Sequence, residues 1–225
     1  MLKSLIRPLH GLKHSVVGYF HDWYYAYDDP RTRINYVVTL KNDFQRRSHG
    51  EICSSMRQLL SVLSDDFAQI VRANADRELT VCGVPRSKAE HSYDRWQTGL
   101  KRTIRQAALQ NLDLADGMDF IVRETTTRTT HLGRSGHGGD GELPRPGLLR
   151  DTCRLSPDIR GRDILLVDDI YTQGVGIDED ALQALLDAGA RSVIFYAVGC
   201  TYKHGVTNPS DFEVVPCQNE RIPEK

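Results

Sequence analysis

The sequence predicts an α/β fold, in which a parallel, twisted core sheet is flanked by helices. Residues 164–167 are consecutive apolar residues, a composition typical of a strand that is buried on both faces. From Asp178 onward, alanines and leucines follow at helical spacing, and Gly189 is placed to end that helix. A second apolar run occupies residues 193–198. Strand, helix and strand in this order predict a βαβ unit, whose two strands are parallel.

The N-terminal region, residues 1–48, is predicted to contain a β-hairpin. Residues 19–27 are rich in aromatic side chains, and residues 34–40 alternate weakly between apolar and polar. The intervening Asp28-Asp29-Pro30 is a turn signal. We therefore expect two short strands joined at this turn.

The middle of the chain alternates predicted helices and strands. Residues 51–75 carry apolar side chains at helical spacing, which predicts a long amphipathic helix. Residues 79–85 are predicted to form the first core strand, residues 99–111 a helix, and residues 119–122 a short strand. This alternation extends the α/β pattern from residue 79 to residue 198.

Residues 124–147 differ in character from their surroundings. They contain almost no apolar side chains and are rich in threonine and glycine, with Arg128 and Arg134 among their basic residues. A loop of this length inside a compact domain is usually either functional or disordered, and both interpretations stay open. His131 and His137 do not predict a metal site, because no further ligand follows at a suitable spacing.

The most informative segment joins two carboxylates to a glycine turn. Asp168 and Asp169 are expected where the strand ends, and the turn that follows lets successive backbone amides face one point. Carboxylates accept hydrogen bonds from vicinal hydroxyls, and amides at a helix N-terminus bind phosphate. The spacing therefore suits a ribose 5-phosphate. Alternatives are a Mg²⁺-holding strand end of a nucleotide hydrolase, which lacks its Gly-x-x-x-x-Gly-Lys-Ser/Thr partner here, and a solvated acidic pair.

Residues 165–174, Leu-Leu-Val-Asp-Asp-Ile-Tyr-Thr-Gln-Gly, closely resemble the phosphoribosyl-pyrophosphate (PRPP) signature of type I phosphoribosyltransferases. Among these, the segment looks most like the competence-protein-F-like group of predicted amidophosphoribosyltransferases. The resemblance implies a phosphoribosyltransferase-like core at residues 49–205, with a mobile lid at about 124–147. It further implies that residues 1–48 form a hood, although the residues themselves favour simple packing of the hairpin onto the core. Residues 206–225 form a tail without a readable motif.

The resemblance also implies roles for individual residues. The catalytic residues would be Asp168, Asp169, Arg128 and Arg134. The ribose hydroxyls would be bound by the two aspartates, and the 5-phosphate by Thr172, Gln173, Gly174, Val175 and Gly176. The diphosphate would be bound by Arg86, Ser87 and Lys88. Mg²⁺ would arrive with PRPP rather than on a side-chain cluster of its own, with Asp168 and Asp169 as its candidate protein contacts.

The predicted function is transfer of the phosphoribosyl group from PRPP to an unidentified nitrogen acceptor, with release of pyrophosphate. The sequence departs from the family pattern at Gln173 and Gly176, where hydroxyl residues are usual. Each lost hydrogen bond to a charged group would cost about 1.5–3 kcal/mol. We expect Gly176 to tolerate threonine, which would restore one such bond. The alternative is a weakly active or non-catalytic PRPP-binding or nucleotide-binding protein that acts with partners in a competence-type or defence-type system.

Composition sets the remaining expectations. The chain has 225 residues, 40% of them hydrophobic, and a formal net charge of −1, so nucleic acid binding is not indicated. No apolar run is long enough to span a membrane, and the five scattered cysteines argue for reduced thiols and against a zinc site. We therefore expect a cytoplasmic protein. The resemblance adds Mg²⁺ and PRPP as its small-molecule partners, and we expect either a homodimer or a complex with a partner protein.

Overall fold

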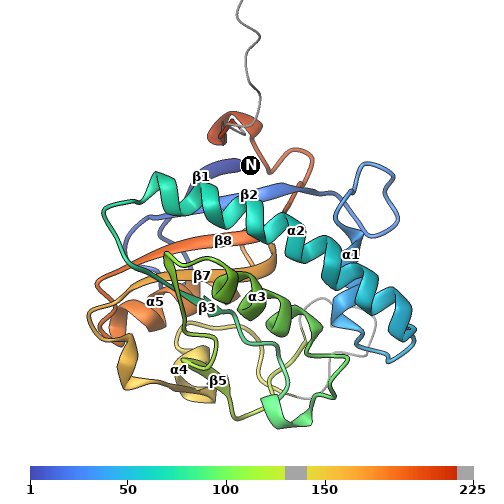
Figure 1. Ribbon diagram of the computed structural model, residues 1–225. Coiled ribbons are helices and arrows are strands. Elements are labelled where there is room, and N and C mark those ends of the chain that lie inside the picture. Colours follow the sequence, from blue (N-terminus) through green and yellow to red (C-terminus); the bar gives the residue numbers. More distant parts are fainter. Residues whose placement is uncertain (130–140, 217–225) are drawn as a thin grey trace, which may run out of the picture.

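The computed structural model describes residues 1–129 and 141–216, and it is built around a seven-stranded sheet (Figure 1). The prediction of a mixed α/β fold with a mostly parallel central sheet is confirmed. In order across the sheet, the strands are β4 (Leu114–Asp116), β3 (Leu79–Gly83), β7 (Asp163–Tyr171), β8 (Ser192–Thr201), β2 (Val16–Tyr24), β1 (Leu2–Ile6) and β9 (Glu213–Val214).

The first five strands of this order run parallel to one another. β3 pairs with both β4 and β7, β7 pairs with β8, and β8 pairs with β2, each in parallel register. β1 is antiparallel to β2, and β9 is antiparallel to β1. The carboxyl ends of the parallel strands therefore meet at one edge, where α/β proteins place their ligands.

Helices cover both faces of the sheet. One face packs against α1 (Asn35–Lys41), α2 (His49–Ala73) and α3 (Gly99–Gln110), and the other against α4 (Leu148–Thr152) and α5 (Ile177–Asp187). Side chains of β7 alternate between the two layers: Leu165 and Val167 face the first core, and Ile164 and Leu166 face the second. A separate antiparallel pair, β5 (Ile121–Arg123) and β6 (Cys153–Leu155), lies beside α4.

Local sequence explains where the major helices begin and end. At the start of α2, the Ser48 hydroxyl accepts a hydrogen bond from the Glu51 amide, and the Glu51 carboxylate accepts one from the Ser48 amide. At the end of α5, Gly189 has φ +94°, a left-handed conformation that favours glycine. The helices predicted at residues 51–75 and 99–111 are confirmed by α2 and α3.

The N-terminal hairpin exists, but its predicted strands are wrong. The antiparallel pair is β1 with β2, and residues 35–41 form helix α1 instead of a second strand. The reason is periodicity: Ile34, Val37 and Leu40 are buried at three-residue spacing, which places them on one face of a helix. β2 also pairs with β8, so the N-terminal segment extends the core sheet.

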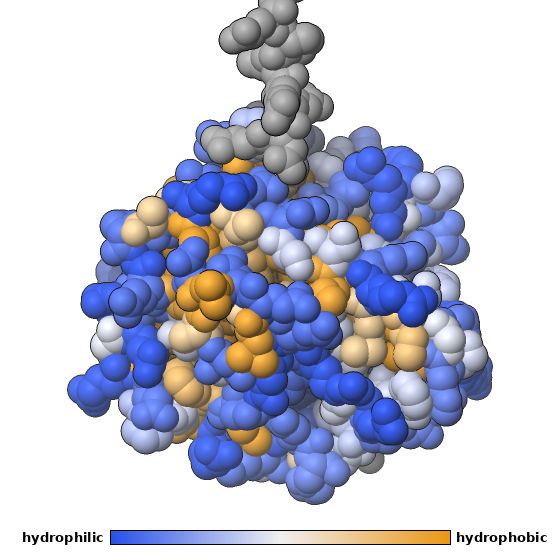
Figure 2. Space-filling model, viewed as in Figure 1, coloured by the Kyte–Doolittle hydropathy of each residue, from blue (hydrophilic) through white to orange (hydrophobic). Residues whose placement is uncertain are grey.

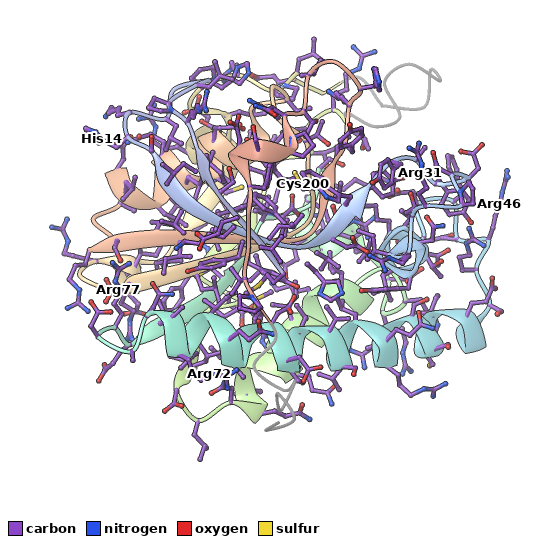
Figure 3. The ribbon with its side chains drawn as sticks, turned by 90° about the horizontal axis from the view of Figure 1, so that it is seen from above. His14, Arg31, Arg46, Arg72, Arg77 and Cys200 are labelled. Atoms are coloured by element: carbon purple, nitrogen blue, oxygen red, sulfur yellow. The ribbon has the colours of Figure 1, made fainter. Side chains whose placement is uncertain are left out.

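The surface is predominantly polar. On the face drawn in Figure 2, hydrophobic residues occur as scattered patches among hydrophilic ones. In the orthogonal view of Figure 3, Arg31 and Arg46 mark one end of the molecule and Arg77 the other, with α2 running between them. Within the described part of the chain, no helix has the length and hydrophobicity required to cross a membrane.

Candidate functional site

A cavity of about 360 Å³ lies at the carboxyl ends of the parallel strands. Each of its walls comes from a different element, so residues distant in the sequence meet there. Its polar lining includes Lys41, Asp43, Arg86, Ser87, Arg123, Thr127, Arg128, Thr129, Asp168, Asp169, Thr172, Asp178, Asp180 and Thr201. The cavity thus brings together the predicted acidic pair, part of the predicted phosphate loop, and several arginines.

The acidic pair lies inside β7 rather than after its end, because the strand continues to Tyr171. Adjacent residues of a strand point to opposite faces. Asp169 accordingly contacts Lys41 on the α1 side, whereas Asp168 is hydrogen-bonded to Asp178 on the α5 side. Both carboxylates line the cavity, but different residues engage them.

Asp168 and Asp178 are two interacting carboxyl groups, and the pKa of each is raised. Burial and the charge of Asp169 raise the pKa of Asp168 to about 7. Burial, followed by the charge of Asp168, also raises the pKa of Asp178 well above its ordinary value. A hydrogen bond between two carboxyl groups requires that one be protonated, so the pair carries less than two negative charges near neutral pH.

Lys41 is a site residue that sequence reasoning missed. Its Nζ atom lies 2.9 Å from Oδ2 of Asp169, and both side chains are largely buried. Burial alone would lower the pKa of Lys41, but the carboxylates of Asp169, Asp168 and Asp43 together outweigh burial and the pKa is raised. Lys41 could have been found only by recognising α1 as a helix that ends beside β7.

The glycine turn brings only part of the predicted phosphate loop to the cavity. Thr172, Val175 and Gly176 line it, whereas Gln173 and Gly174 do not. The Thr172 hydroxyl is 2.7 Å from the Thr201 hydroxyl, which ties the ends of β7 and β8 together. Fewer residues of this loop therefore line the cavity than the sequence predicts.

The expectation that Gly176 tolerates threonine is wrong. Gly176 has φ +86°, and a Cβ atom there would lie 2.8 Å from Cγ of His10. Gly174 has a similar φ of +84°, but a Cβ atom added there would have no neighbour within 4 Å. At both positions the left-handed backbone conformation requires glycine. At Gly176 the contact with His10 excludes a Cβ atom as well.

The three acids at the start of α5 are buried rather than solvated. Beyond Asp178, the Tyr171 hydroxyl donates to Glu179 Oε1 at 2.9 Å. The Asp180 carboxylate accepts hydrogen bonds from the amides of Gly147 and Leu149, the latter at 2.7 Å. Asp180 therefore anchors the start of α4 to α5, a structural role that its position in the sequence does not reveal.

The predicted diphosphate residues separate into two environments. Arg86 lines the cavity, where it contacts the Asp43 carboxylate and stacks 4.4 Å from the Tyr93 ring centre. Ser87 also lines it, with its hydroxyl 2.6 Å from that of Thr129. Lys88 lines a neighbouring cavity of about 60 Å³, which Arg86 lines as well. Of the three predicted diphosphate residues, Arg86 and Ser87 therefore line the larger cavity and Lys88 the smaller one.

The arginines of the predicted lid are only partly described. Arg128 lines the cavity, and among the described residues its buried Nε atom has no hydrogen-bond partner. Arg134 and residues 130–140 of the predicted lid lie outside the described residues. A further arginine that the sequence did not suggest, Arg123, lines the same cavity and is 5% exposed.

Comparison with known proteins gives a weak likeness. No protein-family model matches the sequence, and a search of curated proteins finds no match. Among solved structures, the chain is similar to a crystal structure of a hypoxanthine phosphoribosyltransferase from Staphylococcus aureus, at 11% sequence identity and a TM-score of 0.33. The alignment covers 64% of this chain and 74% of that one. At this TM-score the likeness carries no argument, so function rests on the site itself.

Proposed function

We propose that the cavity binds PRPP and that the protein transfers its phosphoribosyl group to a nitrogen acceptor, with release of pyrophosphate. The observation that carries this proposal is that carboxylates and guanidinium groups line one cavity. Asp168 and Asp169 line it together with Arg86 and Arg128. PRPP needs both kinds of group, because it combines neutral ribose hydroxyls with negatively charged phosphates.

Each half of the ligand would find the groups that its chemistry requires. Carboxylates accept hydrogen bonds from the ribose hydroxyls, and guanidinium groups bind phosphate oxygens in a bidentate manner. The shared proton of Asp168 and Asp178 lowers the negative charge next to the glycine turn. A 5-phosphate near Val175 and Gly176 would therefore meet less repulsion than three ionised carboxylates would produce.

In the proposed reaction, the bond between C1 of the ribose and the diphosphate oxygen breaks, and pyrophosphate leaves with the electron pair. The lone pair of the acceptor nitrogen forms the new bond to C1, and the nitrogen then releases a proton. Positive charge develops on the ribose as the bond breaks. Asp169 would stabilise that charge, because a fixed carboxylate in a partly dry cavity interacts strongly with a nearby cation.

Mg²⁺ fits this site only together with the ligand. Among the described residues, no group of three or more His, Cys, Asp or Glu side chains is arranged to hold a metal. Mg²⁺ is commonly held by phosphate oxygens plus one or two carboxylates. Asp168 and Asp169 would supply those carboxylates, and the ion would neutralise part of the diphosphate charge.

The test is a calorimetric titration of the protein with Mg²⁺-PRPP, followed by measurement of pyrophosphate release with a panel of nucleobases, glutamine and ammonia. Replacing Asp168→Asn and Asp169→Asn together should abolish binding while the circular dichroism spectrum stays native. Asp163→Asn is the matched control, because Asp163 lies on the same strand but pairs with Arg191 outside the cavity. Unchanged PRPP affinity in the double variant would refute the ribose assignment.

A second candidate is a PRPP-binding accessory protein of a competence-type or defence-type system that does not catalyse transfer. The observation that favours it is that both sides of the cavity are already partly neutralised. Lys41 pairs with Asp169, and Arg86 pairs with Asp43. A ligand would have to compete with these ion pairs, which suits a sensor better than a rapid enzyme. Tight PRPP binding without pyrophosphate release from any acceptor would support this candidate.

A further inference from the structure

A groove of about 630 Å³ lies between β2, α1 and α2, apart from the site described above. As far as the chain is described, it has no lining residue in common with the 360 Å³ cavity. Most of its side chains are polar, which distinguishes it from an apolar docking surface. The lining residues are His21 and Asp22 of β2, Arg33, Ile34 and Tyr36 of α1 and the segment before it, and Gln58, Ser61 and Val62 of α2.

A buried carboxylate orients the histidine of this groove. Nδ1 of His21 lies 2.9 Å from Oδ2 of Asp66, which also accepts a hydrogen bond from the Tyr196 hydroxyl. An ionised carboxylate only accepts hydrogen bonds, so neutral His21 carries its proton on Nδ1 and a lone pair on Nε2. The side chain of His21 is 32% exposed and that of Asp66 only 4%, so the exposed edge of the imidazole is the one that carries Nε2.

Tyr36 adds a hydroxyl group that is not engaged. Its Oη atom is buried, and within the described part of the chain it has no hydrogen-bond partner. Burial raises the pKa of Tyr36, and the charges of Asp66 and Asp22 raise it further, so this hydroxyl lies in the negative field of both carboxylates. A buried hydroxyl without a partner destabilises the fold, and a ligand that forms a hydrogen bond with it removes that cost.

The charges around the groove determine which kind of ligand fits. Arg33 and Asp22 compensate each other, because Nε of Arg33 lies 2.9 Å from Oδ2 of Asp22. Asp66 has His21 as its ion-pair partner, and the charge of Asp66 is compensated only when His21 is protonated. With His21 neutral, one negative charge is left, and both Nε2 of His21 and the Tyr36 oxygen accept hydrogen bonds. A cation with several N–H donors fits these conditions, whereas an anion does not.

We propose that this groove binds a small primary amine in its ammonium form. The N–H donors of the ammonium group match Nε2 of His21 and the Tyr36 oxygen, and its charge compensates that of Asp66. The alkyl part of the amine would lie against Ile34 and Val62 of the same groove. Binding requires neutral His21, so it weakens where His21 takes up a proton. The site is independent of the cavity proposed for PRPP, and either can exist without the other.

The test follows the imidazole nitrogens of His21 by NMR in protein that carries ¹⁵N-labelled histidine, with the His21 signals assigned from a His21→Gln variant. In neutral His21, the proton should be on Nδ1. Butylammonium should shift the Nε2 signal saturably, whereas tetramethylammonium, which has the same charge but no N–H donor, should not. Affinity for butylammonium should fall at least about fivefold between about pH 8 and about pH 5.5, because histidine takes up a proton in this range while an alkylamine stays charged.

Two variants make the result decisive. Tyr36→Phe removes the unengaged hydroxyl and keeps the ring, so the folded protein should be as stable as the parent or more stable, while butylammonium affinity falls at least about fivefold. Tyr202→Phe is the matched control, because the Tyr202 ring packs against Trp23 and Tyr25 outside the groove, and it should bind like the parent.

Several results would overturn the proposal. If Tyr36→Phe binds butylammonium like the parent, or if tetramethylammonium shifts the His21 signal equally, the groove is only a negatively charged surface. A proton on Nε2 of neutral His21 would leave no acceptor for the ammonium group. A shift of the His21 signal by inorganic phosphate, with none by butylammonium, would show that the groove binds anions instead.

Discussion

Gly176 combines two separate requirements for glycine, and they can be measured independently. We predict that Gly176→Ala destabilises the protein more than Gly174→Ala, because both replacements strain a left-handed backbone but only the first meets His10. The backbone strain should cost about 1–2 kcal/mol in each variant. Denaturant unfolding should show an additional steric cost of about 1–3 kcal/mol for Gly176→Ala.

His10→Gly provides the control for this prediction. It removes the contacting side-chain atoms, and His10 itself has φ +50°, so glycine is compatible with its backbone. In the His10→Gly background, the two alanine variants should lose similar amounts of stability. An unchanged gap between them would mean that His10 is not the source of the steric cost.

The Asp168–Asp178 pair should make stability depend on pH with a defined sign. The pKa of Asp168 is raised from an ordinary 3.8 to about 7, so the folded protein binds a proton that the unfolded chain releases. The free energy of unfolding should therefore fall as pH rises from about 4 to about 7, by up to about 1.4 kcal/mol per pH unit for each proton that the folded pair retains. Asp178→Asn should flatten this slope and raise stability at pH 8.

Unfolding midpoints measured between pH 4 and pH 8 test the carboxyl pair directly. Asp113→Asn is a suitable control, because Asp113 is exposed and outside the cavity. Its slope should match that of the parent. A parent protein and an Asp178→Asn variant with the same pH dependence would contradict the shared proton.

At the scale of single residues, the sequence predicted those site residues whose placement depends on local structure. Asp168, Asp169 and Thr172 follow directly from a strand and its turn, and all three line the cavity. Lys41 and Arg123 could not be predicted, because each reaches the cavity only through the packing of an element distant in the sequence. Lys88 lines the neighbouring cavity, and its direction depends on how the chain turns after β3.

Among the elements, α2 is joined to the sheet by a buried carboxylate as well as by apolar packing. Oδ2 of Asp66 accepts a hydrogen bond from the Tyr196 hydroxyl at 2.8 Å and lies 2.9 Å from Nδ1 of His21. Asp66 is almost fully buried, and its two partners lie on β8 and β2. We predict that Asp66→Ala costs about 2–4 kcal/mol, because both partners would lose their hydrogen bond.

Denaturant unfolding of two single variants, Asp66→Ala and Asp65→Ala, tests this connection. Asp65 is the preceding residue of the same helix and is exposed, so its replacement should change stability by about 0.5 kcal/mol or less. Equal effects in the two variants would show that helix propensity, rather than the buried contact, accounts for the loss.

Element length decided which parts of the fold could be predicted. The 25 residues of α2 repeat the helical period often enough to identify it without ambiguity. The 7 residues of α1 do not, and a weak alternation over the same stretch was interpreted as a strand. β1 has only 5 residues and pairs with β2 and β9, so its place depended on partners that no local pattern specifies.

For the whole molecule, burial predicts an order of local stability. Most residues of β7 and β8 are buried, whereas both residues of β9 are exposed at the edge of the sheet. We predict that amides of the two central strands exchange with solvent only on global unfolding. Amides of β1 that face β9 should exchange through local opening. Hydrogen exchange that is equally slow at the edge and the centre would contradict this order.

The position of β2 also has a consequence for how the protein is made. β2 lies between β8 and β1 in the sheet, yet its residues 16–24 leave the ribosome long before its parallel partner at residues 192–201. Throughout most of translation, one edge of this early strand has no native partner. Parallel pairing over such a separation is slow and exposes unpaired edges to other chains. Newly synthesised chains should therefore depend on chaperones until β8 has emerged.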